Sequence, residues 1–263
     1  MGISHACFGL SYLTALGLEA AQQVWPGRAL RVAGLVFGSA GLLAHTLFLV
    51  YHQPNPAGAF GSLVLLAWVF AVFYLYGAFH RGSQRAWGVF ALPLVVALVG
   101  VSFLFRGDPA TGSWFSGDHF WGTVHGILVL LSSVGITVGF LASVMYLVQA
   151  RRLRMKKNPL GGMRLLSLER LETMNRRAIN LAFPLLTVGV LLGVVRMPLG
   201  AGHPGWTDAK ILGTVGLWVV AVVLLYLRYA AHVPPRRLAL LTLAAFGLML
   251  VTLVTSHPFA EGR

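Results

Sequence analysis

Long apolar runs alternate with short polar gaps along the whole chain. Eight runs are each close to the ~20 residues that a membrane-spanning helix needs. They cover residues of about 3–24, 32–51, 60–79, 87–105, 121–149, 178–196, 210–229 and 238–256. This pattern predicts an all-α, polytopic membrane bundle of about eight transmembrane helices, formed as a single membrane domain over residues 1–263.

The composition fits a lipid environment. Hydrophobic residues make up 57% of the chain and charged residues only 10%, whereas a soluble domain carries roughly 25% charged residues. The net charge of +13 does not indicate nucleic-acid binding, because the basic residues lie in the gaps between apolar runs. In such gaps they report topology and contact with anionic lipids.

Basic residues are concentrated in every second gap. Sixteen of the twenty Lys and Arg residues fall in the first, third, fifth and seventh connections. The positive-inside rule places these connections in the cytoplasm and both termini outside. The first run also lacks the basic start and cleavage site of a secretory leader, so we interpret it as a retained helix. We therefore expect a multi-pass protein of a bacterial inner (cytoplasmic) membrane.

The long fifth connection contains an amphipathic segment at residues 163–177. Its apolar positions recur every third residue, at Leu165, Leu168, Leu171 and Met174. Glutamates lie near its start and arginines near its end, as the helix dipole favours. We interpret this cytoplasmic segment as an interfacial helix on anionic lipid, with docking of a partner protein as the alternative.

Histidines are frequent near the predicted outer face. Two neutral imidazoles can hold one haem iron from opposite sides. His125 begins the fifth run and His257 ends the eighth, so both lie at the outer depth. His45, within the second run, is a further cofactor-binding candidate, because a buried imidazole without a partner is costly. Three others are interpreted as ordinary hydrogen-bonding groups near the interface: His5, His52 and His119.

The sixth connection carries Trp206 and Asp208 just before the seventh run. Asp208 is well placed to cap the following helix, and Trp206 could anchor the chain at the membrane interface. The alternative for Trp206 is an aromatic platform against a porphyrin face. The spacing alone leaves these alternatives open.

Two features concern the first two runs. Glu19 lies toward the inner end of the first run, where it could pair with a neighbouring helix or extend toward the cytoplasm. Gly34, Gly38 and Gly41 in the second run are small residues that can let helices approach closely. The single cysteine, Cys7, excludes a Cys-x-x-Cys-His attachment site, so any haem is expected to bind without thioether links to this chain.

Three stretches carry a resemblance to a known family: Trp121–Leu128, Ser167–Ala178 and Gly205–Lys210. With them the chain resembles the cytochrome c assembly family, which includes the CcsA, CcmC and HemX-type proteins. It is closest in pattern to the HemX-type branch. Two positions depart from the family pattern: the sixth connection keeps a single tryptophan, and Tyr226 stands where CcsA proteins have a histidine.

The resemblance implies a haem site at the outer face. By position, His125 and His257 match the pair of iron ligands that flanks a tryptophan-rich loop, the WWD motif, and Trp206 and Asp208 match the end of that loop. The expected cofactor is non-covalent haem b, and the expected partners are a CcsB-like protein and apocytochrome c. We expect haem handling for cytochrome c maturation, with no catalysis by this chain on its own.

The alternative is a HemX-type regulator or scaffold of haem biosynthesis that acts through the basic cytoplasmic connection. A transporter is a third class, but the sequence shows no convincing internal repeat of the kind that transporters often have.

Overall fold

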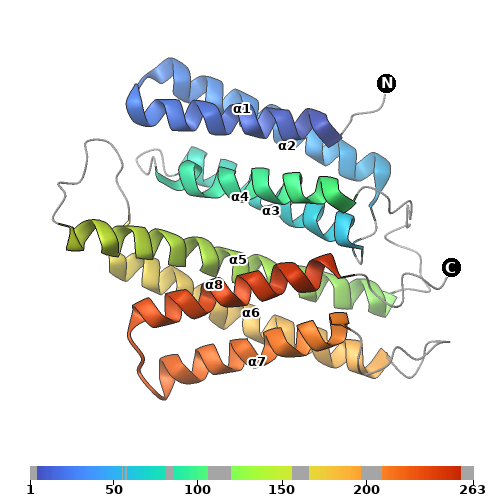
Figure 1. Cartoon of the computed structure of the whole chain (residues 1–263). Coiled ribbons are helices and arrows are strands. Elements are labelled where there is room, and N and C mark those ends of the chain that lie inside the picture. The colour runs from blue at the N-terminus through green and yellow to red at the C-terminus, as the bar shows by residue number, and fades with distance from the viewer. Residues whose placement is uncertain are drawn as a thin grey trace. The chain divides into compact units, whose positions relative to one another are not determined.

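The structure, a computed structural model, describes residues 5–54, 56, 58–80, 86–105, 120–155, 166–196 and 209–255. The regular elements in these ranges are eight α-helices and one short 3-10 helix (Figure 1). They are α1 (His5–Val24), α2 (Arg28–His52), α3 (Ala59–His80), α4 (Ala86–Ser102), η1 (Phe103–Phe105), α5 (Phe120–Arg154), α6 (Leu168–Arg196), α7 (Ala209–Tyr229) and α8 (Pro235–Val254). The all-α prediction is therefore confirmed.

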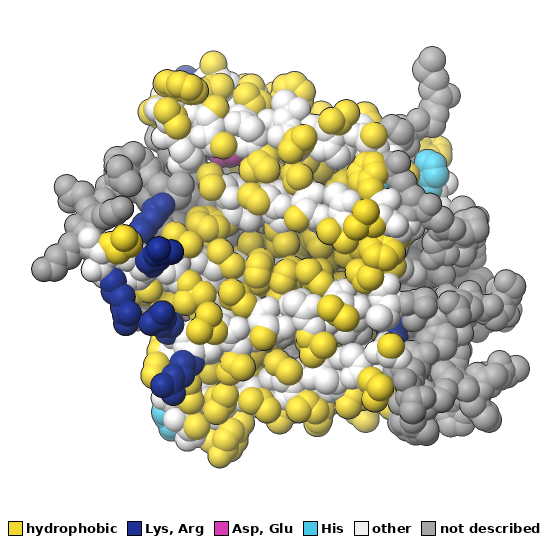
Figure 2. Space-filling view, viewed as in Figure 1, with side chains coloured by type: hydrophobic (Ala, Val, Ile, Leu, Met, Phe, Trp, Pro, Cys, Tyr) yellow, Lys and Arg dark blue, Asp and Glu magenta, His cyan; other side chains and the backbone are white. Residues whose placement is uncertain are grey.

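Seven of the eight described α-helices are long and apolar enough to cross a membrane, and α1 is the exception. Helix α1 has 20 residues but carries Thr14, Glu19, Gln22 and Gln23, which lower its mean hydropathy. Figure 2 shows that the visible side surfaces of the helices are mainly apolar, with Lys and Arg side chains gathered at one end. The chain is thus a polytopic membrane bundle, while the orientation of its termini stays a prediction.

The helices form two compact units. Unit 1 contains α1, α2, α4 and η1 together with α3 from Leu63, and unit 2 contains α6, α7, α8 and α5 up to Ala150.

Glycines on α2 allow close packing in unit 1. A methyl group added at Gly41 would lie 2.9 Å from Cε1 of Tyr12 on α1, and one added at Gly38 would lie 2.9 Å from Cε1 of Tyr74 on α3. Both tyrosine side chains are fully buried. The small residues noted in the sequence therefore make room for two large aromatic rings, as is common where membrane helices meet.

The helices of unit 2 alternate in direction. Gly189, near the end of α6, lies against Val129 near the start of α5. At the same end of the unit, Gly213 near the start of α7 lies against Thr252 near the end of α8. The connections expected on the outer face therefore leave unit 2 at one end.

Helix α6 differs from the expectation of two separate elements. The amphipathic segment, described from Leu166 onward, and the sixth apolar run form one continuous helix. Ser167 caps it, since its Oγ accepts the backbone N–H of Arg170 at 3.3 Å. Leu171 is fully buried, so at this position the apolar stripe packs inside the protein, whereas the exposed Arg176 and Arg177 can still meet lipid headgroups.

The close approach at Gly41 generates a stability prediction. Gly41→Ala should lower the free energy of unfolding by about 1–3 kcal/mol relative to Gly17→Ala, because the added methyl group overpacks the Tyr12 ring. Gly17 has no heavy atom within 4 Å of an added Cβ, and both changes bring the same gain in helix propensity. Thermal unfolding of the purified variants in detergent measures the difference, and equal melting temperatures would contradict the packing described here.

Candidate functional site

His125 has the arrangement expected of a histidine prepared to bind a metal. It lies near the start of α5, half-buried, and its Nδ1 is 2.8 Å from the carbonyl oxygen of Gly189 on α6. A carbonyl group only accepts, so Nδ1 must carry the hydrogen and donate it. The lone pair of the neutral imidazole is then on Nε2. Metal-binding histidines are typically fixed in this way through their other ring nitrogen.

Neighbouring residues shape the surroundings of this imidazole. Gly193 on α6 lies directly beside the ring, since a methyl group there would be 3.1 Å from His125 Cε1. Lys210, in the first turn of α7, is near enough for its positive charge to act on the imidazole. The site therefore combines an oriented imidazole with a cation at the same end of unit 2.

Three of the expected site residues lie outside the described residues: Trp206, Asp208 and His257. Helix α7 begins at Ala209, directly after Asp208, and α8 ends at Val254, three positions before His257. The start of α7 and the end of α8 lie together at one end of unit 2. The roles expected of these residues stay predictions.

His45 belongs to unit 1. It is completely buried in α2, its Nδ1 makes a 3.3 Å hydrogen bond with Tyr12 Oη, and its ring stacks on Phe8 with centroids 4.1 Å apart. Its Nε2 has no hydrogen-bond partner among the described residues. His45 is thus a buried imidazole in an aromatic cluster, and its assignment to a cofactor stays a prediction.

The histidines interpreted as ordinary hydrogen-bonding groups behave so where they are described. His5 Nε2 lies 3.0 Å from Ser102 Oγ, and His52 Nδ1 lies 3.2 Å from the carbonyl oxygen of Phe48. His119 is outside the described residues. Both described histidines lie at the same end of unit 1. Their hydrogen bonds do not turn the two rings toward a common site.

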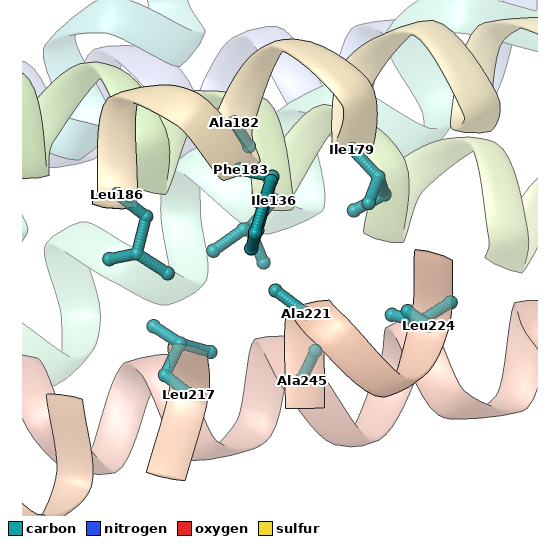
Figure 3. Close-up of a pocket in the computed structure, with 9 residues that line it drawn as sticks. All are labelled: Ile136, Ile179, Ala182, Phe183, Leu186, Leu217, Ala221, Leu224 and Ala245. Atoms are coloured by element: carbon teal, nitrogen blue, oxygen red, sulfur yellow. The ribbon is translucent and has the colours of Figure 1, made fainter. Parts of the chain in front are cut away.

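Unit 2 also contains a small cavity between its helices. It is lined by Ile136, Ile179, Ala182, Phe183, Leu186, Leu217, Ala221, Leu224 and Ala245 (Figure 3). Its volume is about 10 Å³, close to the space of a single water molecule, whereas small-molecule sites usually need roughly 300 Å³ or more. This apolar cavity is therefore too small for a small-molecule ligand.

Comparison with known proteins decides the family. The model of the family described as "Cytochrome C assembly protein" matches residues 57–258, which is well over half of the chain. The chain belongs to the cytochrome c assembly protein family. The match spans α3 and α4 of unit 1 and all four helices of unit 2, and it includes His125 and His257, whereas His45 precedes it.

Two curated proteins are similar to parts of this chain. "Protein HemX" of Bacillus subtilis (strain 168) is 26% identical over 128 residues, which are 49% of this chain and 46% of that protein. "Cytochrome c biogenesis protein CcsA" of Thermosynechococcus vestitus is 33% identical over 99 residues, 38% of this chain and 31% of that protein. The matched regions thus span less than half of each relative. No solved structure matches the chain.

The sequence analysis missed the polar centre of unit 2, which is Asn175 on α6. Its buried Nδ2 lies 3.0 Å from the Gly139 carbonyl oxygen, 2.8 Å from Ser143 Oγ and 3.2 Å from Thr242 Oγ1. Its Oδ1 accepts a hydrogen bond from Nη2 of Arg228 on α7. One amide therefore contacts α5, α7 and α8 from α6. Asn175 lies among charged residues of the amphipathic segment, so the sequence offered no signal that separated it from its solvent-facing polar neighbours.

Arg228 donates a hydrogen bond to the Asn175 side chain through Nη2. Nε and Nη1 of Arg228 are buried and have no hydrogen-bond partner among the described residues. Tyr226, two residues before it on the same helix, is 63% exposed and therefore points away from this network. The position at which CcsA proteins have a histidine thus supplies no buried imidazole here.

Asn175→Ala is expected to lower the free energy of unfolding by about 2–4 kcal/mol, because it removes four contacts and leaves a buried guanidinium without its acceptor. Asn180→Ala is the matched control: Asn180 is an exposed residue of the same helix, and its Nδ2 donates a hydrogen bond to Tyr229 Oη at 2.6 Å. This control should cost less than about 1 kcal/mol. Unfolding followed by circular dichroism measures both, and equal losses would refute a central role for Asn175.

Proposed function

We propose that the chain binds haem non-covalently at the outer end of unit 2 and handles it as cargo in cytochrome c maturation. Family membership supports a role in cytochrome c maturation, and the geometry of His125 supports its role as a ligand of the haem iron. The observation that carries the proposal is the bond from His125 Nδ1 to the Gly189 carbonyl oxygen, which leaves Nε2 as the ligating atom. The site would face the non-cytoplasmic side of a bacterial inner membrane.

The remaining contacts to haem are assigned by their position in the family pattern. His257 would be the second axial ligand, and Trp206 would lie against the porphyrin face, with Asp208 positioning the loop. Lys210 adds a positive charge near His125, which suits the carboxylates that haem carries on one edge. This set combines two neutral ligands, an aromatic surface and a cation, and it requires no covalent link to the chain.

The expected action is binding and presentation. The described residues near His125 provide a ligand, a hydrogen-bond acceptor and a charge, a set suited to holding and orienting haem. We propose that a CcsB-like protein completes the complex in which haem is attached. The second histidine candidate, His45, would be a separate site in unit 1.

His125→Ala should weaken haem binding at least about tenfold, because one of two axial imidazoles is lost. The measurement is the visible absorption spectrum of the purified chain during titration with haem. Free imidazole should restore part of the spectrum by occupying the vacated position. His257→Ala should act likewise. His52→Ala removes an exposed imidazole whose Nδ1 bonds the Phe48 carbonyl oxygen of its own helix, and it should leave the titration unchanged.

Gly193→Ala provides a test that keeps the ligand. Its methyl group would press on the His125 ring at 3.1 Å, whereas Gly126→Ala, one residue after His125, meets no heavy atom within 4 Å. We therefore expect Gly193→Ala to alter the haem spectrum or affinity and Gly126→Ala to do neither. Absence of haem absorbance in the wild-type chain, even after haem addition, would reject the proposal as a whole.

A second candidate function, regulation of haem biosynthesis, is motivated by the exposed arginines of the basic segment at the start of α6. The structure indicates how to test it without breaking the core. Three exposed arginines near the start of α6, Arg170, Arg176 and Arg177, can be changed together to Gln, because deletion of the segment would remove the buried Leu171 and Asn175.

If the chain acts as such a regulator, the triple Gln variant should change the level of a haem-synthesis enzyme and leave c-type cytochromes intact. Immunoblots and haem-stained gels of the same cells measure the two outcomes. Normal enzyme levels together with reduced c-type cytochromes would instead support maturation.

A further inference from the structure

Unit 1 contains a carboxyl group that the haem site does not use. Glu19 lies on α1, half-buried, and its Oε1 accepts a 3.2 Å hydrogen bond from the hydroxyl group of Tyr74 on α3. Tyr74 is fully buried. This is the single hydrogen bond that the carboxyl group makes to the described residues. The Glu19 carboxyl group is therefore linked to the interior of the unit by the buried hydroxyl group of Tyr74.

Two glycines make room for this contact. A methyl group at Gly88 on α4 would lie 3.0 Å from Glu19 Cδ and 3.1 Å from Tyr74 Cε2, and one at Gly38 on α2 would lie 2.9 Å from Tyr74 Cε1. The tyrosine ring is thus held between α2 and α4 while its hydroxyl group reaches α1. All four long helices of unit 1 contribute to the arrangement, so it is a built feature of the interior.

Among the described residues, no charged side chain forms an ion pair with the Glu19 carboxyl group. Arg31 on α2 is exposed and acts on the carboxyl group through its charge, but it makes no ion pair with it among the described residues. Helix α3 presents Tyr74, α4 presents Gly88, and Gln23 of α1 bonds the Glu19 backbone oxygen. Residues 81–85, which join α3 and α4, lie outside the described residues.

An ionised carboxylate with one hydrogen bond is expensive in such surroundings, since burial away from water disfavours the charged form. Uptake of a proton removes the charge and gives the group a donor of its own. We propose that Glu19 is a proton-binding site of unit 1, where the carboxyl group takes up and releases a proton while Tyr74 holds it in position. The site is independent of haem at unit 2.

Dicyclohexylcarbodiimide tests this assignment, because this apolar reagent adds to protonated carboxyl groups and leaves a stable N-acylurea. The full-length chain in membranes is treated over a range of pH, digested, and analysed by mass spectrometry. At neutral pH, labelling of Glu19 should exceed that of Glu169, an exposed carboxylate at the start of α6, by at least about tenfold. Labelling of Glu19 should fall as the pH rises.

Tyr74→Phe separates positioning from packing, since the ring between the two glycines is retained. Loss of the hydroxyl donor removes stabilisation of the charged carboxylate, so the labelling midpoint should move to higher pH by about one unit. Thermal unfolding of Tyr74→Phe should stay close to wild type. An unchanged midpoint would overturn the role of Tyr74.

Two results would overturn the proposal itself. The first is labelling of Glu19 that rises only at acidic pH, together with that of Glu169. The second result comes from infrared difference spectra of wild type against Glu19→Gln, which are recorded if the reagent fails to reach Glu19 even at acidic pH. Absence of a carboxylic acid C=O band at neutral pH in these spectra would overturn the proposal. Presence of that band would support the proposal without the reagent. Haem titration is read separately and does not affect either outcome.

Discussion

A single buried amide is the polar interaction on which unit 2 depends. In a bundle surrounded by lipid, apolar side chains lose little by facing outward, so hydrophobic burial does not by itself fix how helices align. Asn175 does so by contacting the other three helices at once. Trp218 Nε1 adds a hydrogen bond to Thr187 Oγ1 between α7 and α6. Polar contacts of this kind are directional, and they set the register in which Gly189 meets His125.

The helices of unit 1 are aligned mainly by close packing of small residues against large ones. Its contacts rely on glycines opposite tyrosines, as at Gly41 with Tyr12 and Gly38 with Tyr74, and on one indole bond from Trp68 to Thr46. Small residues bring the backbones close enough for dispersion forces to act along the helices. The hydroxyl groups of the two tyrosines then reach a histidine and a glutamate that would otherwise lie in apolar surroundings.

The sequence predicted the helices well because apolar length is a strong signal in lipid. It divided residues 163–177 from residues 178–196 because the chain changes from charged to apolar near Ala178. No residue there interrupts a helix, and the structure has one continuous helix across this point. The orientation of His125 could not be predicted, because its acceptor is 64 residues away in the chain. The importance of Asn175 depended on four separate helices meeting at one point, which periodicity does not encode. For Trp206, Asp208 and His257, the family pattern remains the basis of their assignment.

Helix α6 has 29 residues, a length of about 43 Å at 1.5 Å per residue, and Pro184 in its interior has no N–H group to donate to the preceding turn. The helix carries Asn175 near one end and Gly189 and Gly193 near the other. Pro184 lies between these two regions, and proline is the typical cause of a bend in a helix. The direction of the carbonyl group that orients His125 therefore depends on the backbone at this proline as well as on the contacts that hold Asn175.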